Sequence, residues 1–261
     1  MPYAANPDDS VKIRYAVEGD GPPLLLHHGF MGRVENWRER GYADALSESY
    51  RLILMDARGH GWSGKPQFAE AYAMELRVSD VTAVLDAVGV EQVHFFGYSM
   101  GGHTGFGMLK HASERLASLI IGGMVPYASD PEPLNDHAHM LRSGMHALVD
   151  GMETQAGERL AEPFRSTLLG NDAVSLIAST LATRDTPGLE GSLANATMPS
   201  LLFAGDADPA HDLVRRAAGE MPNAKFVSLA GLDHLSAAER SDLVLPHVTQ
   251  FLARAIAEGG A

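Results

Sequence analysis

The stretch HFFGYSMGGHT at residues 94–104 decides how this chain folds. It leads from an apolar segment into Ser99, which is flanked by Gly97 and Gly101, and then into a helix-like segment. This arrangement matches the pattern G-x-S-x-G, in which a serine occupies a sharp turn between a strand and a helix. Glycine two residues before and after the serine avoids clashes in so tight a turn. We therefore expect the Ser99 hydroxyl at the carboxyl end of a strand, and the alternative is a glycine-rich turn with an inert serine.

Short apolar runs recur along the chain and predict the strands of a sheet. They are LLLHH (24–28), LILM (52–55), VHFF (93–96), LII (119–121), LLFA (201–204) and FVSL (226–229). Runs this short that are apolar on both faces are typical of buried strands in a mostly parallel sheet. Apolar residues at helical spacing lie between several of them, as from Val78 to Val88 and from Val244 to Ala255. The alternation predicts an α/β fold with helices on both faces of the sheet.

The alternation of strands and helices lapses over residues 126–197. This segment opens with a proline-rich loop and then places apolar residues at helical spacing, without a convincing strand. We therefore predict a helical cap over 126–197, inserted into a core domain formed by residues 1–125 and 198–261.

The composition argues against several classes of partner. The chain has 261 residues, with 20 Lys and Arg against 33 Asp and Glu, which gives a net charge of 20 − 33 = −13. Such a balance disfavours nucleic acids and anionic membranes, since both need clustered basic residues. There is no cysteine, no secretory signal pattern and no apolar run near the ~18 residues of a membrane span. We expect a cytoplasmic protein whose oligomeric state, monomer or small homo-oligomer, the sequence leaves open.

Ser99 needs chemical helpers, and two later strand ends supply them. A serine hydroxyl is a weak nucleophile that requires a base, which a third group must orient. LLFAGDADP places Asp206 and Asp208 after one predicted strand, and FVSLAGLDHLS places His234 after the next. Catalytic triads whose serine lies in a G-x-S-x-G turn have this order along the chain: serine, then acid, then histidine.

Four motifs, in this order and spacing, resemble those of the α/β-hydrolase superfamily over nearly the whole chain. They are HHGF (27–30), DARGHGWS (56–63), GYSMGG (97–102) and the pair GDAD (205–208) and GLDH (231–234). GYSMGG together with HGF is most similar to the small esterase, lactonase and cofactor-free haloperoxidase branch. The resemblance implies the α/β-hydrolase fold and a Ser-His-Asp enzyme that needs no cofactor. It also implies a helical cap over the site.

The family pattern assigns the acid of the triad by position. The acid is the third residue after the glycine that follows the strand, which from Gly205 gives Asp208 rather than Asp206. The triad that the resemblance implies is therefore Ser99, Asp208 and His234. Asp206 is expected to cap a turn instead.

The resemblance also implies the groups that surround the triad. In related enzymes, backbone N–H groups at the positions of Phe30 and Met100 form the oxyanion hole, which stabilises a negative oxygen. The residues that we expect to contact substrate are Phe30, Trp62, Met124, Leu141 and Met145. Core packing explains helical methionines equally well.

Two further groups of polar residues look chemical but are better explained structurally. Asp56 and Arg58 of DARGHGWS are expected to lock a loop. His137 and His139 invite a metal site, but no third ligand accompanies them in the sequence. We therefore expect solvated histidines there, and no metal.

The sequence favours hydrolysis of a small carboxylic ester or lactone through an acyl-enzyme. Perhydrolysis, seen as cofactor-free haloperoxidase activity, is one alternative on the same triad, and hydrolysis of a C–C bond is another. A ligand receptor without activity would not need a complete triad. Nothing in the sequence specifies the acyl or alcohol part of the substrate.

Overall fold

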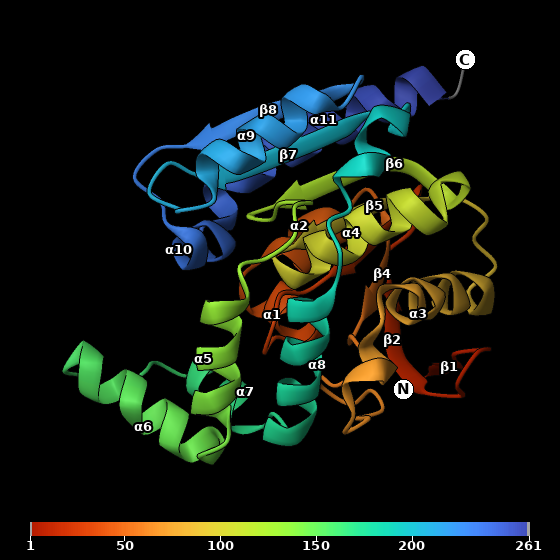
Figure 1. Ribbon diagram of the computed structural model, residues 1–261. Helices are drawn as coiled ribbons and strands as arrows, with labels where there is room; N and C mark the ends of the chain where they lie inside the picture. The colour runs from red at the N-terminus through yellow and green to blue at the C-terminus, as the bar shows by residue number, and fades with distance from the viewer. Residues whose placement is uncertain (1, 260–261) are drawn as a thin grey trace.

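The computed structural model describes residues 2–259 and builds them around one eight-stranded sheet (Figure 1). The strands are β1 (Tyr3–Ala5), β2 (Lys12–Glu18), β3 (Pro23–His27), β4 (Arg51–Met55), β5 (Val93–Tyr98), β6 (Leu116–Gly122), β7 (Ser200–Gly205) and β8 (Ala224–Leu229). Their order across the sheet is β1-β2-β4-β3-β5-β6-β7-β8. Each predicted apolar run coincides with one of the strands β3 to β8, so these strand predictions are confirmed.

The sheet is mostly parallel. Strands β3 to β8 pair in parallel with their neighbours, whereas β1 pairs antiparallel with β2, and β2 antiparallel with β4. The apolar runs do not predict β1 and β2. Strand β1 has only three residues, and β2 (KIRYAVE) mixes charged and apolar side chains because part of it faces solvent.

Helices cover both faces of the sheet, as predicted. One face carries α3 (Met74–Ala87), α4 (Met100–His111) and α9 (His211–Glu220). The other face carries α1 (Val34–Glu39), α2 (Tyr42–Ser47), α10 (His234–Glu239) and α11 (Ser241–Gly259). Successive side chains of a strand point to opposite faces. Accordingly, Phe95 of β5 belongs to the apolar cluster under the first group of helices, and Phe96 to the cluster under the second.

Residues between β6 and β7 form a separate group of helices. They are α5 (Pro131–Leu141), α6 (Gly144–Ala156), α7 (Phe164–Leu169) and α8 (Ala173–Asp185), followed by the short 3-10 helix η3 (Glu190–Asn195). In Figure 1, α5 to α8 lie together at one end of the molecule, and α6 projects outward from it. The buried side chains of Leu141, Met145 and Leu176 pack there against Phe30 and Met31 of the loop after β3. We call α5 to α8 the helical segment.

Hydrogen bonds from the side chains of Arg77 and Asn171 hold the helical segment on the core. Arg77 of α3 is buried, and its Nη2 donates to the carbonyl of Ser179 at 3.2 Å and to Thr183 Oγ1 at 3.1 Å, both on α8. Asn171, which precedes α8, donates through Nδ2 to the carbonyl of Met31 at 2.9 Å. The position of the helical segment thus depends on polar contacts as well as on apolar packing.

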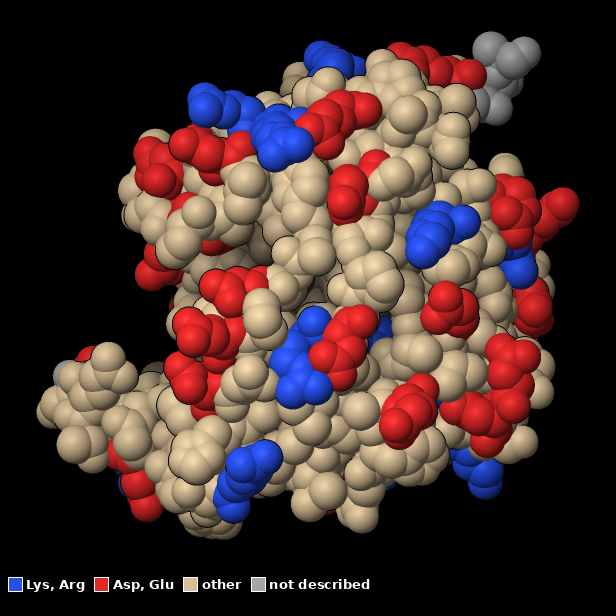
Figure 2. Space-filling view, viewed as in Figure 1, with Lys and Arg blue, Asp and Glu red and all other residues tan. Residues whose placement is uncertain are grey.

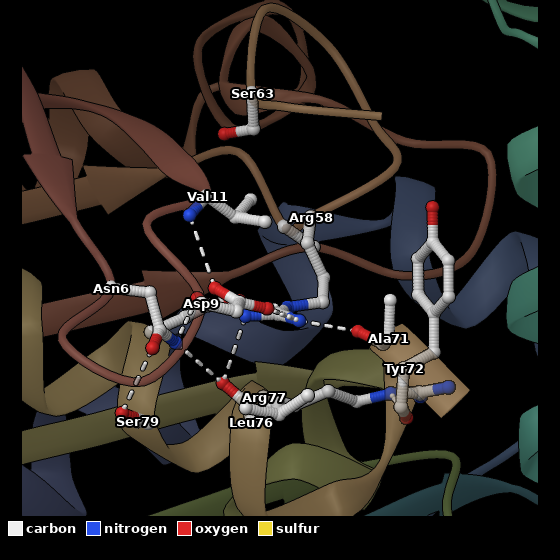
Figure 3. A network of polar contacts seen from close by, with 12 residues as sticks. Asn6, Asp9, Val11, Arg58, Ser63, Ala71, Tyr72, Leu76, Arg77 and Ser79 are labelled. Carbon is white, nitrogen blue, oxygen red and sulfur yellow. Dashed lines mark hydrogen bonds and ion pairs between the residues drawn. The ribbon is translucent and has the colours of Figure 1, made fainter. Parts of the chain in front are cut away.

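The loop after β4 is held by a buried arginine (Figure 3). Arg58 donates through Nε and Nη2 to Asp80 at 2.6 and 2.7 Å, and through Nη1 to Asp9 at 2.9 Å and to the carbonyl of Ala71. Asp56 accepts hydrogen bonds from two backbone N–H groups, at 2.7 and 2.9 Å. The structural interpretation of Asp56 and Arg58 is therefore confirmed.

The surface carries more acidic than basic side chains, in line with the net charge of −13. Figure 2 shows acidic side chains spread over much of the visible face, with fewer basic ones between them. Among the helices of residues 2–259, none combines the length and the apolar character needed to cross a bilayer.

Two buried histidines predict that the fold loses stability in mild acid. Burial lowers the pKa of His27, on β3, and of His103, on α4, each to about 3. A histidine in the unfolded chain titrates near ~6.5. Between these values the unfolded chain binds protons that the folded chain does not, so stability falls as the pH drops. Between pH 6.5 and pH 5.5 the free energy of unfolding should decrease by about 1 kcal/mol for each of these histidines, or about 2 kcal/mol for both.

Urea unfolding at pH 6.5 and at pH 5.5 measures this loss, with His103→Gln as the matched variant. We expect the variant to show a smaller decrease than the wild type, because one of the histidines whose pKa burial lowers has been removed. Equal unfolding free energies at the two pH values in the wild type would contradict the expectation.

Candidate active site

Ser99 occupies a strained turn between β5 and α4. Its backbone has φ 52° and ψ −117°, a conformation that residues other than glycine rarely adopt. A Cβ on Gly97 would lie 2.3 Å from the carbonyl oxygen of Gly101, and a Cβ on Gly101 would lie 2.1 Å from that of His27. The glycines are therefore required by close backbone contacts, and the turn presents the half-buried Ser99 side chain at the carboxyl end of β5.

The loops after β7 and β8 are tied together by their backbones. The N–H of Asp206 donates to the carbonyl of Leu229 at 3.0 Å, and the N–H of Ala207 donates to that of Leu232 at 3.0 Å. A Cβ on Gly205 would lie only 1.9 Å from the carbonyl oxygen of Leu232, so glycine permits this close approach. These contacts bring the acidic residues after β7 next to the histidine after β8.

His234 bridges Ser99 and Asp208. Its Nδ1 lies 2.8 Å from Asp208 Oδ2, and its Nε2 lies 3.0 Å from Ser99 Oγ. Since a carboxylate only accepts hydrogen bonds, Nδ1 carries the proton and Nε2 accepts from the Ser99 hydroxyl. The histidine side chain is 36% exposed, and Ser99 is also partly exposed.

The two aspartates after β7 have different surroundings. Asp208 is 6% exposed, and besides His234 it accepts from the N–H of Ala210 at 2.9 Å. Burial opposes ionisation of Asp208, but these two hydrogen bonds outweigh it and hold the pKa of the carboxyl below its ordinary value. Asp206 instead accepts from the N–H of Gly231 at 2.7 Å. Only Asp208 contacts the histidine.

The loop after β3 and the first turn of α4 meet beside Ser99. A Cβ on Gly29 would lie 3.4 Å from Ser99 Cβ, so the loop that leads to Phe30 passes directly beside the serine. Met100 is the first residue of α4, where N–H groups have no partner within the helix. The N–H groups of Phe30 and Met100 are thus both close to Ser99 in the chain or in space.

The predicted substrate-contacting residues lie in three different places. Phe30, Leu141 and Met145 belong to one apolar cluster where the helical segment meets the core. Met124 packs beside α4, where a Cβ on the neighbouring Gly102 would lie 3.0 Å from its Cβ. Trp62 is 68% exposed and lines a cleft together with Gly32, Lys65, Thr167 and Asn171. The structure therefore brings together Phe30, Leu141 and Met145, but neither Met124 nor Trp62.

Histidines near Phe30 have structural contacts. His28 accepts the N–H of Ala57 through Nε2 at 3.0 Å, and its Nδ1 donates to the carbonyl of Gly29 at 2.8 Å. The ring of His137 packs edge-on against Phe30, with centroids 5.3 Å apart, and burial lowers the pKa of this histidine. His139 is exposed. Within residues 2–259, no group of three or more His, Asp or Glu side chains is placed to hold a metal ion.

No sequence pattern singles out Tyr98, although its side chain contacts the histidine. Its hydroxyl donates to the backbone carbonyl of His234 at 2.5 Å, and the two rings are 5.4 Å apart. The only sequence signal is its place next to Ser99. The partner is 136 residues further along the chain, beyond the reach of any local pattern.

The comparisons with known proteins agree with this fold. The family model described as the alpha/beta hydrolase fold matches residues 22–171. The chain therefore belongs to the α/β-hydrolase family and is an enzyme of that fold.

Individual relatives extend the likeness over nearly the whole chain. A hydrolase from Pseudomonas aeruginosa PA01 shares 26% of its residues with this chain, covers 96% of it over 97% of its own length, and superimposes with a TM-score of 0.85. The enol-lactonase from Burkholderia xenovorans LB400 is 25% identical, with coverages of 97% and 100% and a TM-score of 0.85. A protein of Bacillus subtilis (strain 168), provisionally named 2-succinyl-6-hydroxy-2,4-cyclohexadiene-1-carboxylate synthase, is 26% identical over 92% of this chain and 95% of its own.

Proposed function

We propose that this protein hydrolyses a small carboxylic ester or lactone, with Ser99 as nucleophile, His234 as general base and Asp208 as the acid that orients it. The observation that carries the proposal is the unbroken chain of hydrogen bonds from Asp208 through His234 to Ser99 Oγ, at 2.8 and 3.0 Å. The likeness to an enol-lactonase along the full chain supports lactones as one substrate class.

In the first half of the proposed reaction, Ser99 Oγ bonds to the carbonyl carbon of the substrate. The hydroxyl proton passes to His234 Nε2, and the ionised Asp208 stabilises the resulting imidazolium. His234 then gives this proton to the departing alkoxide oxygen as the C–O bond breaks. An acyl-enzyme remains on Ser99, and the alcohol leaves; in a lactone, the alcohol stays attached to the acyl chain.

Water completes the proposed reaction with the same residues. His234 Nε2 takes a proton from a water molecule, whose oxygen bonds to the acyl carbon, and returns that proton to Ser99 Oγ as the acid is released. In both halves the carbonyl oxygen becomes negative. The N–H groups of Phe30 and Met100 would donate to it, each contributing roughly 3 kcal/mol in typical enzymes.

A substrate panel tests the proposed activity. Turnover of p-nitrophenyl esters of graded chain length and of simple lactones is expected, and it should be insensitive to EDTA. Perhydrolysis is tested in parallel by following halogenation of an acceptor molecule in the presence of acetate, peroxide and a halide. If no ester or lactone is turned over while Ser99 still reacts with a fluorophosphonate, the triad serves another reaction, such as one related to the synthase-named relative.

The chain-length preference should depend on Phe30. Its ring lies 5.5 Å from that of His60 in the core and 5.3 Å from that of His137 on α5, so it occupies the junction between core and helical segment beside Ser99. Phe30→Ala enlarges the space at this junction and keeps the backbone N–H. We expect kcat/KM to shift toward longer acyl chains, measured with the same esters.

Trp62→Ala tests a second of the five predicted substrate-contacting residues in the same assay. The exposed cleft around Trp62 is lined by a different set of residues, so its truncation should leave the chain-length profile unchanged. A profile that changes with Trp62→Ala and not with Phe30→Ala would place substrate binding in that cleft instead.

A further inference from the structure

Tyr98 directly precedes Ser99 in the chain and contacts His234 through space. It lies at the end of β5, is 7% exposed, and packs its ring 5.4 Å from the imidazole of His234 at an interplanar angle of 48°. Its hydroxyl donates to the backbone carbonyl of His234 at 2.5 Å. The side chain therefore touches both the ring and the backbone of the histidine.

The surroundings of Tyr98 leave its hydroxyl little freedom. Its ring contacts Phe203 of β7, with centroids 6.0 Å apart. On another side lies Gly123, with φ +59°, where an added Cβ would be 3.0 Å from the hydroxyl oxygen of Tyr98 and 3.0 Å from Cε1 of His234. The N–H of Gly123 donates to the carbonyl of Phe203 at 2.9 Å. Tyr98 and Gly123 thus pack against the histidine, and Phe203 packs behind Tyr98.

The position of His234 needs such support. It is the first residue of α10, a helix of only six residues, and its side chain is 36% exposed. Apart from its bond to Ser99 Oγ, the imidazole is held only through Nδ1 by Asp208, and that contact leaves the ring able to rotate about it. A second fixed point on the backbone, at the carbonyl that Tyr98 holds, restricts where Nε2 can lie relative to Ser99 Oγ. Burial, together with nearby Asp208, raises the pKa of Tyr98, so its hydroxyl keeps the proton that it donates.

We propose that Tyr98 is a positioning residue, whose hydroxyl holds the His234 backbone so that Nε2 stays within hydrogen-bond reach of Ser99. This inference rests on the proposed roles of Ser99 and His234. Because productive proton transfer tolerates only small misplacements, loss of this one hydroxyl should slow activation of Ser99 roughly ten-fold. It should leave KM for an ester nearly unchanged, since Tyr98 does not line the open side of the serine.

The test measures activation of Ser99 without any substrate turnover. A fluorophosphonate reacts with Ser99 as Oγ bonds to phosphorus, the P–F bond breaks, fluoride departs and His234 takes the hydroxyl proton. The second-order rate constant of this labelling is compared for the wild type, Tyr98→Phe and Tyr72→Phe. Tyr72 is the matched control, because it too is buried and donates to a backbone carbonyl, that of Pro66, at 2.7 Å.

We expect labelling about ten-fold slower in Tyr98→Phe and unchanged in Tyr72→Phe, at a temperature where circular dichroism shows all three proteins folded. Exchange of the His234 Nδ1 proton with water, followed by proton NMR, should also be faster in Tyr98→Phe only. Should Tyr98→Phe fail to fold, Tyr98→Met replaces it, since it also lacks the hydroxyl and keeps a large apolar side chain.

Two outcomes would overturn the inference, and a third would refute the proposed function on which it rests. Labelling of Tyr98→Phe at the wild-type rate would overturn it, and so would equal slowing in Tyr72→Phe, which would indicate general loosening of the core. A wild-type protein whose Ser99 is not labelled at all would instead refute the proposed function.

Discussion

Ser99→Ala is expected to lower kcat by roughly 10³-fold or more while the protein remains folded. The substitution removes one oxygen atom, and with it the only nucleophile that His234 Nε2 contacts, at 3.0 Å. Folding should not suffer, because alanine does not add atoms to the strained turn. Hydrolysis of the best ester in the panel, compared at equal concentrations of folded protein, measures the effect.

The control for this variant is Ser63→Ala, which removes a hydroxyl from the loop after β4. Ser63 Oγ donates to the carbonyl of Asp56 at 2.7 Å, far from any role in the proposed reaction. Its loss should affect stability rather than kcat. A Ser99→Ala variant that retained a tenth of wild-type activity would refute the assignment of Ser99.

Asp208→Asn should lower kcat by as much as about 10⁴-fold, whereas Asp206→Asn should have a small effect. An amide at position 208 can present an N–H to Nδ1 of His234, which favours the tautomer with the proton on Nε2. That tautomer cannot accept the proton of Ser99. At position 206 an asparagine oxygen can still accept the N–H of Gly231, so the loop is kept.

The two aspartate variants form a matched pair, because they lie two residues apart and lose the same charge. Their kcat values, measured with one ester, provide the comparison. If Asp206→Asn proved the more damaging, the orientation of His234 would have to come from a residue other than the one that contacts it in the structure.

The sheet and the meeting of the loops after β5, β7 and β8 could be predicted from the sequence for a physical reason, whereas the choice of Asp208 over Asp206 came from the resemblance to the family. Buried parallel strands must be apolar on both faces, so β3 to β8 are visible as uninterrupted apolar runs. Parallel strands place their carboxyl ends at one edge of the sheet, so polar residues that follow β5, β7 and β8 meet there. Gly101 and Gly205, which mark these loops, must be glycine, because a Cβ at either position would lie about 2 Å from a backbone carbonyl oxygen.

Contacts between distant side chains were not accessible in this way. Nothing local indicates that Phe30 packs against Leu141 and Met145, since the turn of the helical segment toward the core depends on contacts such as that of Asn171. The same holds for Tyr98, whose hydroxyl meets a backbone carbonyl, a group that every residue possesses. The apolar runs do not reveal the edge strand β1 or its neighbour β2, because β1 has only three residues and both strands are partly exposed.

Direct detection of the acyl-enzyme tests the central claim. The wild-type protein is mixed with p-nitrophenyl acetate, quenched in acid within milliseconds to seconds, digested and analysed by mass spectrometry. The account predicts one acetyl group per chain, on the peptide that contains Ser99, and a matching burst of p-nitrophenol. Turnover of the ester without an adduct on Ser99, or with the acetyl group on another residue, would contradict it.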